Sequence, residues 1–116
     1  MGEVDISVEF ARLKTANPVW TASGTCGYAD ELGDFMDVSK LGGFITKSVT
    51  IKPRQGNPTP RIVETDSGML NAIGLANVGV DEFITEKLPA IEKMSCSVFV
   101  NIAGETIDDF QFLARK

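Results

Sequence analysis

Phe44-Ile45-Thr46-Lys47-Ser48-Val49 is a short apolar stretch that becomes polar towards its carboxyl end. Gly42-Gly43 precedes it and a proline-rich loop follows it, so the stretch is predicted to form a strand. Its polar residues fall where the strand ends, and that is where α/β proteins build their sites.

Two other apolar stretches share this form. Residues 19–22 are followed by Ser23-Gly24, and residues 97–102 carry Asn101 near their end. Helical patterns over residues 30–40 and 81–94 separate the three predicted strands. Strands alternating with helices predict a parallel sheet, hence an α/β fold. A polar group at the carboxyl end of each successive strand is typical of a (β/α)8 TIM barrel.

The chain is too short for a whole barrel of this kind. A (β/α)8 barrel takes roughly 250 residues, and the chain has 116. We therefore expect residues 1–116 to be an incomplete part of one barrel domain, comprising a leading hairpin and about three of the eight βα units. Its open sheet edges predict that the segment alone is marginally stable, prone to association and inactive.

Hairpins are predicted at two places. Residues 5–10 alternate apolar and polar side chains, as a half-buried strand does, and residues 13–18 are predicted to turn. Residues 52–60 contain prolines and a glycine, which predict a loop. Residues 61–65 and 68–71 then pair as a second hairpin.

The helix over residues 81–94 begins near Asp81, and Pro89 is expected to kink or shorten it. A further helix follows the third strand. Thr106 and Asp109 have the spacing of a capping box, which predicts a helix start that continues through Leu113.

Composition excludes several classes of protein. The hydrophobic fraction is 43%, the net charge is -5 and there is no histidine. Basic residues are dispersed, so no nucleic-acid partner is expected, and no apolar run is long enough to span a membrane. The acidic start lacks the form of a signal peptide. Cys26 and Cys96 form no CxxC pair, which favours structural thiols in a reduced cytoplasmic setting and no metal site.

Each candidate site residue has an ordinary alternative. Lys47 would stabilise negative charge on a flavin ring or bind a substrate carboxylate, but spacing alone slightly favours a solvated lysine. Residues 71–77, with Asn71 and Asn77 around a glycine, suit a planar ring with alternating carbonyl and N–H groups, or form a turn. Ser23 fits a cofactor loop or a βα turn, and Asn101 fits a site or an Asx-turn.

Five motifs in order resemble one known family. The stretch covering nearly the whole chain resembles the N-terminal part of class 1 dihydroorotate dehydrogenase, and is closest to the class 1B catalytic subunit. The motifs are Asn17-Pro18-Val19-Trp20-Thr21-Ala22-Ser23-Gly24-Thr25, Thr46-Lys47-Ser48-Val49-Thr50, Gly56-Asn57-Pro58-Thr59-Pro60-Arg61, Asn71-Ala72-Ile73-Gly74-Leu75 and Val100-Asn101-Ile102-Ala103-Gly104.

The resemblance implies an FMN-containing barrel that oxidises dihydroorotate to orotate in de novo pyrimidine biosynthesis. It implies a homodimer and, for class 1B, a second subunit that carries FAD and a [2Fe–2S] cluster and passes electrons to NAD⁺. The residues implied to contact FMN are Ser23, Lys47, Ser48 and Asn101. Those implied to bind substrate are Lys47, Asn71, Ala72, Ile73, Gly74 and Leu75.

The chain departs from the family pattern at two points. Cys26 stands where the family usually has an aromatic residue. The family's catalytic base is a cysteine after the fourth strand, so no catalytic residue is expected within this chain, and neither Cys26 nor Cys96 takes that role. A dihydropyrimidine dehydrogenase-type flavoenzyme and a non-catalytic barrel fragment remain the alternatives.

Overall fold

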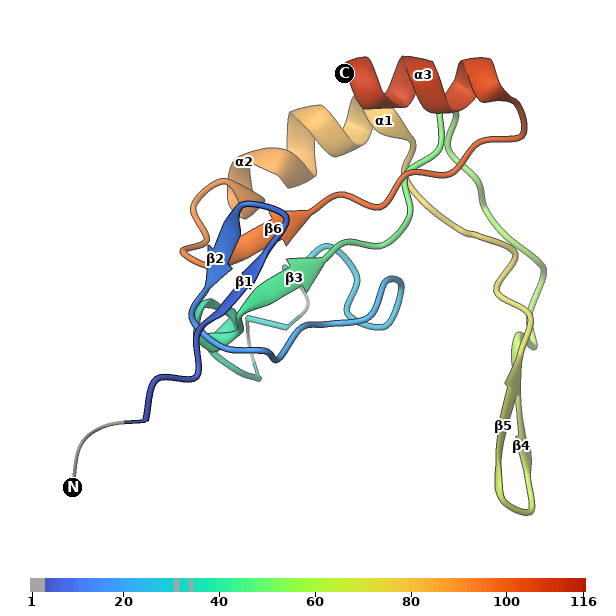
Figure 1. Cartoon of the computed structure of the whole chain (residues 1–116). Helices are drawn as coiled ribbons and strands as arrows, with labels where there is room; N and C mark the ends of the chain where they lie inside the picture. The colour runs from blue at the N-terminus through green and yellow to red at the C-terminus, as the bar shows by residue number, and fades with distance from the viewer. Residues whose placement is uncertain (1–3, 31, 34) are drawn as a thin grey trace.

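Parallel strand pairing organises the chain. The computed structural model describes residues 4–30, 32–33 and 35–116. Strands β3 (Gly43–Ile45) and β6 (Ser97–Phe99) run parallel, with Phe44 opposite Val98. Parallel bridges join Trp20 to Gly43 on one side of β3, and Val49 to Ile102 beyond its end. The three predicted strand segments therefore lie in chain order with β3 in the middle, and the α/β prediction is confirmed (Figure 1).

The two faces of this sheet bury different layers. Phe44 is fully buried and packs with Ala29, Val38 and Val98. Val98 also packs against the core that includes the helix residues Phe83 and Ile91. Successive side chains of a strand point to opposite faces, and Ile45 and Phe99 accordingly lie on the other face. There the Phe99 ring packs against Trp20, with ring centroids 4.8 Å apart.

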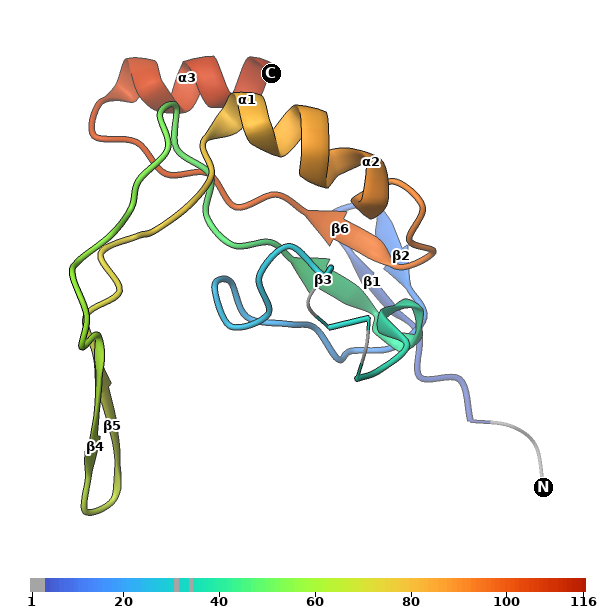
Figure 2. The same ribbon diagram turned by 180° about the vertical axis from the view of Figure 1, so that it is seen from behind.

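A helical layer covers the Phe44 face. Helix α1 (Val80–Glu82), the π-helical turn η2 (Phe83–Lys87) and α2 (Leu88–Ile91) are continuous, so the predicted second helix is confirmed with a shorter end. Pro89 has no N–H to continue the α-helical ladder, and the π turn lies directly before α2. Helix α3 (Ile107–Arg115) lies beside this layer in both views (Figures 1 and 2). The buried core shared by sheet and helices comprises Tyr28, Val49, Val80, Phe83, Ile91 and Leu113.

The predicted helix over residues 30–40 is wrong for the described part of that range. It contains turns and one 3-10 helix, η1 (Val38–Lys40). Asp37 accepts the backbone N–H of Ser39 and so starts a separate turn at its own position. Residues 31 and 34 of the predicted helix lie outside the described residues.

The predicted strand over residues 19–22 is reduced to the single bridge at Trp20. Pro18 has no N–H to donate, and the side chain of Asn17 accepts the backbone N–H groups of Val19 and Gly42. These side-chain bonds hold residues 17–20 beside the start of β3, in place of the regular hydrogen bonds of a strand pair.

The leading hairpin is confirmed, but its predicted bounds are wrong. Strands β1 (Val8–Phe10) and β2 (Leu13–Thr15) pair antiparallel, so part of the predicted turn over 13–18 is a strand. The connecting residues Ala11 and Arg12 have φ of 46° and 71°. Two left-handed residues in a two-residue loop are the requirement of a type I′ turn, which the residue types Ala and Arg do not indicate.

The second hairpin is confirmed and projects from the body of the protein. Strands β4 (Ile62–Thr65) and β5 (Gly68–Asn71) pair antiparallel, and every residue in them is exposed. Both views show this hairpin standing away from the sheet and helices (Figures 1 and 2). The radius of gyration is 16.4 Å, above the about 13 Å expected for a compact chain of this length.

Helix α3 begins with the predicted capping box. The Thr106 hydroxyl accepts the N–H of Asp109, and the Asp109 carboxylate accepts the N–H groups of Thr106 and Glu105, at 3.1 and 2.8 Å. These two backbone donors hold the pKa of Asp109 below its ordinary value of 3.8. Among the described residues no helix has the length and apolarity to cross a bilayer.

The cap predicts an acid-dependent loss of stability. Because the pKa of Asp109 is lowered by folding, its ionised form stabilises the fold above pH 3.8, and this contribution is lost as the pH falls below that value. Asp109→Asn should therefore lower the urea midpoint at about pH 6, and the gap to the parent protein should narrow at about pH 3. Asp108→Asn, in the same helical turn, is the control. A gap that stays constant with pH would contradict this role of the cap.

Candidate functional site

A polar cluster joins the carboxyl ends of the three parallel segments. The Asn101 side-chain amide nitrogen donates to the hydroxyl oxygens of Ser23 and Ser48, at 2.5 and 2.7 Å. Ser23 in turn donates to the carbonyl oxygen of Thr46, at 3.0 Å. Asn101 thus contacts two of the other predicted flavin-contacting residues, Ser23 and Ser48, although the three lie far apart in the sequence.

Lys47 lies beside this cluster. Its backbone N–H donates to the carbonyl oxygen of Gly27 at 2.9 Å, which ties the end of β3 to the loop after Trp20. Lys47 follows the last residue of β3, Ile45, by two positions. Its side chain is half-buried, and among the described residues its ammonium has no hydrogen bond or ion pair.

The donors and acceptors left over at this cluster fit a flavin ring. The Asn101 amide nitrogen and Ser23 are paired within the cluster. Among the described residues, the Asn101 side-chain oxygen, the Ser48 hydroxyl proton and the Lys47 ammonium have no partner. An isoalloxazine ring carries carbonyl oxygens, ring nitrogens and one N–H, so two spare donors and one spare acceptor match its edge.

Thr46 belongs to the cluster and lies outside the predicted site residues. Its side chain is 0% exposed. Its hydroxyl oxygen accepts the backbone N–H of Asn101 at 3.1 Å, and its own N–H donates to the carbonyl of Phe99. The one signal for it in the sequence is a hydroxyl residue directly after the apolar residues Phe44 and Ile45.

The predicted substrate loop has a strained backbone. Gly74 and Leu75 both have positive φ, of 75° and 56°. A Cβ at Gly74 would lie 2.7 Å from the backbone nitrogen of Asn57, so only glycine fits there. Asn57 also donates to the carbonyl of Ala72 at 2.9 Å and from its backbone N–H to that of Ile73 at 3.1 Å. The loop over residues 52–60 therefore shapes this segment.

Asn77 has a structural role. It is buried, and its side-chain oxygen accepts the N–H groups of Thr50 and Gly79 together with the Thr50 hydroxyl. Its amide nitrogen donates to the carbonyl of Leu75 at 2.8 Å. The side-chain oxygen and nitrogen of Asn77 are thus both hydrogen-bonded to neighbouring residues and hold the end of the loop in place. Asn71, at the end of β5, is exposed.

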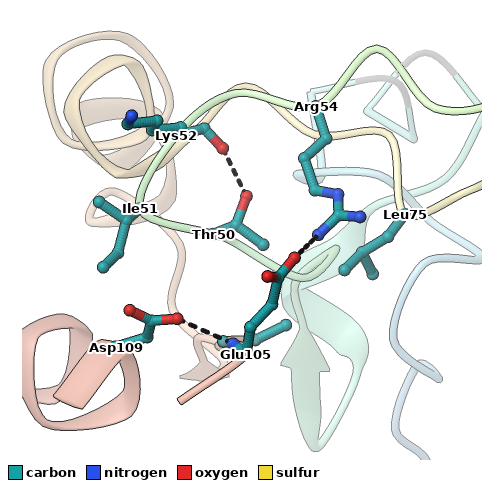
Figure 3. Close-up of a pocket in the computed structure, with 9 residues that line it drawn as sticks. Thr50, Ile51, Lys52, Arg54, Leu75, Glu105 and Asp109 are labelled. Atoms are coloured by element: carbon teal, nitrogen blue, oxygen red, sulfur yellow. Dashed lines mark hydrogen bonds and ion pairs between the residues drawn. The ribbon is translucent and has the colours of Figure 1, made fainter. Parts of the chain in front are cut away.

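A pocket of about 310 Å³ adjoins both the loop and the third strand segment. Leu75 of the loop lines it together with Ala103 and Gly104, just beyond Asn101. Arg54 and Glu105 form an exposed ion pair of 3.2 Å at this pocket (Figure 3). The residues lining the pocket are Thr50, Ile51, Lys52, Arg54, Leu75, Ala103, Gly104, Glu105 and Asp109.

The structure joins the predicted flavin residues more closely than the predicted substrate residues. In the described part of the chain, no hydrogen bond links residues 71–75 to Ser23, Lys47, Ser48 or Asn101. The pocket beside Leu75 is what relates the loop to the segment after Asn101.

Neither cysteine is in a disulfide. Cys26 and Cys96 are both half-buried and pack against the core around Phe44. Burial raises the pKa of the Cys96 thiol. A thiol with a raised pKa forms less of the reactive thiolate, which is consistent with a structural role.

Comparison with known proteins identifies the family. The family model described as dihydroorotate dehydrogenase matches residues 5–116. The chain belongs to the dihydroorotate dehydrogenase family. The resemblance found in the sequence motifs is confirmed.

Curated relatives specify the class. The dihydroorotate dehydrogenase B (NAD(+)) catalytic subunits of Geotalea uraniireducens and Geotalea daltonii are 55% and 53% identical to this chain over its whole length. The chain spans 38% of the length of each of these relatives. Their names favour dihydroorotate dehydrogenase over the dihydropyrimidine dehydrogenase-type alternative.

Solved structures of dihydroorotate dehydrogenase share the fold of this chain. An Eimeria tenella DHODH crystallised with ferulenol is 26% identical, with a TM-score of 0.74, and the match covers 93% of this chain and 32% of that one. The ligand-free form from the same organism has a TM-score of 0.71 at 27% identity, covering 95% of this chain and 34% of that one.

Proposed function

We propose that this chain forms part of a flavin-dependent enzyme that oxidises dihydroorotate to orotate in de novo pyrimidine biosynthesis. The observation that carries the proposal is the Ser23–Asn101–Ser48 cluster with Lys47 beside it, in a chain of the dihydroorotate dehydrogenase family. Further strands would continue the parallel sheet from its two open edges into a (β/α)8 barrel.

Ser23, Lys47, Ser48 and Asn101 would hold FMN. When bound, FMN supplies an acceptor for the hydride that leaves the substrate. The Asn101 oxygen and the Ser48 hydroxyl would orient the ring through their unused hydrogen-bonding positions. The Lys47 ammonium would stabilise the negative charge that develops on reduction, because a fixed positive charge at a half-buried position is only partly screened by water.

Lys47 and residues Asn71, Ala72, Ile73, Gly74 and Leu75 would bind the substrate. A dihydroorotate molecule presents a carboxylate, which suits an ammonium, and ring amides, which suit an asparagine and exposed backbone groups. The left-handed conformation of Leu75 supports this role, since backbone strain in non-glycine residues gathers at ligand-binding segments. The catalytic base is not proposed to lie among residues 1–116.

The assembly proposed is that of class 1B. The related chains are named catalytic subunits, which implies a further subunit in those proteins. By analogy, this protein would form a homodimer and pair with an electron-transfer subunit that carries FAD and a [2Fe–2S] cluster and reduces NAD⁺. Free, half-buried cysteines fit the reducing cytoplasm.

The direct test uses the protein expressed at the full length of its relatives. Anaerobic addition of dihydroorotate should bleach the absorbance of bound flavin and release orotate in equal amount. Dihydrouracil, which lacks the carboxylate, should leave the flavin oxidised. Bleaching by dihydrouracil and not by dihydroorotate would overturn the proposed substrate.

Gly74→Ala tests the substrate loop. The added Cβ must displace Asn57 and occupy a left-handed conformation, so we expect the KM for dihydroorotate to rise about tenfold or more, with FMN content unchanged. Gly68→Ala in the adjacent hairpin is the control, because its Cβ would meet only the Thr65 hydroxyl at 3.8 Å. An equal KM in the two variants would remove residues 71–75 from the substrate site.

A further inference from the structure

We infer that Thr46 is the positioning residue of the flavin site, an inference that rests on the proposed function. Thr46 lies on the central segment of the three that build the polar cluster. It contacts both neighbours: Ser23 donates to its carbonyl oxygen at 3.0 Å, and its hydroxyl oxygen accepts the backbone N–H of Asn101 at 3.1 Å. Because the Thr46 side chain is 0% exposed, it does not contact a ligand itself and acts through these two residues.

The Thr46 hydroxyl occupies a position that a regular parallel ladder would give to a backbone group. The ladder runs through Ile45 and Phe99 and resumes where Val49 pairs with Ile102. Between these points the Thr46 oxygen takes the N–H of Asn101. This side-chain acceptor fixes the backbone of Asn101 where its side chain must reach both Ser23 and Ser48.

Removing the acceptor should displace the cluster. A valine at this position has the shape of threonine but leaves the Asn101 N–H without a partner, and a buried unpaired donor is costly. The segment carrying Asn101 is then expected to shift so that its N–H finds another partner. The Asn101 side chain moves with it, away from one or both serines. A serine at position 46 keeps the oxygen and loses only a methyl group.

Three readouts on the protein expressed at the full length of its relatives test this inference. Thr46→Val should weaken FMN binding by about tenfold, which is the effect expected from leaving one buried N–H donor without an acceptor. It should also shift the reduction potential of bound FMN. Thr46→Ser should stay within a few-fold of the parent protein for both. In the apo protein, the NMR chemical shifts of the Asn101 side-chain amide should change in Thr46→Val and stay the same in Thr46→Ser.

Thr15→Val is the control for loss of a buried threonine. Thr15 is 2% exposed, and its hydroxyl donates to the carbonyls of Val8 and Asn17 in the leading hairpin. It should lower thermal stability without changing FMN affinity or potential. Equal FMN affinity in Thr46→Val and the parent protein would overturn the role of Thr46 while leaving the proposed function intact. A parent protein that binds no FMN would overturn both.

Discussion

Replacing Lys47 with alanine is expected to lower the turnover of dihydroorotate by about 100-fold or more, while the thermal midpoint changes little. The loss in turnover follows from removing a fixed positive charge where negative charge develops in the transition state. The small change in stability follows from the structure: Lys47 is a half-buried residue, and its ammonium has no ion pair or hydrogen bond among the described residues. The backbone bond from Lys47 to Gly27 survives the substitution.

The control for this prediction is Lys14→Ala. Lys14 lies on β2, where it is exposed and outside the polar cluster. Its replacement removes the same charge from the molecule without touching the site. Steady-state kinetics with saturating dihydroorotate compare the two variants. Equal turnover in both would show that Lys47 is a solvated surface lysine.

Asn101→Ala is expected to weaken FMN binding by about 100-fold. The substitution removes the side-chain oxygen proposed to meet the ring, and it also removes the two hydrogen bonds that hold Ser23 and Ser48 in place. Loss of the direct bond to the ring and loss of the ordered serines, at about tenfold each, give this magnitude. Fluorescence titration of the apo protein with FMN measures the affinity, because free FMN fluorescence changes on binding.

Asn17→Ala is the matched asparagine control. Asn17 is partly buried and bonds to the backbone of Val19, Lys40 and Gly42, so its loss should destabilise the fold. It lies outside the polar cluster and should leave FMN affinity within a few-fold of the parent. If Asn17→Ala weakened FMN binding as much as Asn101→Ala, the effect of Asn101 would be one of general stability.

The parallel sheet and the meeting of Ser23, Ser48 and Asn101 could be predicted from the sequence. Each residue follows an apolar stretch, and the ends of parallel strands meet at one edge. The α3 cap was predictable for a similar reason, since Thr106 and Asp109 contact each other within a single helical turn. The strand-end cluster and the helix cap could both be predicted because each follows from a pattern within a short stretch of sequence.

Other features depend on contacts that no local pattern carries. The helical spacing over residues 30–40 was misleading, because Asp37 bonds to Ser39 and begins a separate turn. The left-handed Ala11 and Arg12 are held by strand pairing on both sides, although neither residue type favours that conformation. Thr46 was missed because its importance lies in a bond to Asn101, which is distant in the sequence.

The contact between residues 71–75 and the flavin residues remains a prediction.

The 116-residue segment on its own is expected to associate through exposed apolar side chains of the β4–β5 hairpin and of α3, among them Leu70 and Ile107. Size-exclusion chromatography of that segment measures this. A monomer that melts cooperatively would contradict it.

The most direct measurement is a crystal structure of the protein expressed at the full length of its relatives, with FMN and orotate bound. It should show the isoalloxazine ring at the carboxyl ends of the parallel strands, with the Lys47 ammonium and the Asn101 side chain within hydrogen-bond distance of the ring, and orotate between the ring and residues 71–75. A flavin bound elsewhere, with Lys47 and Asn101 in solvent, would contradict the site proposed for this chain.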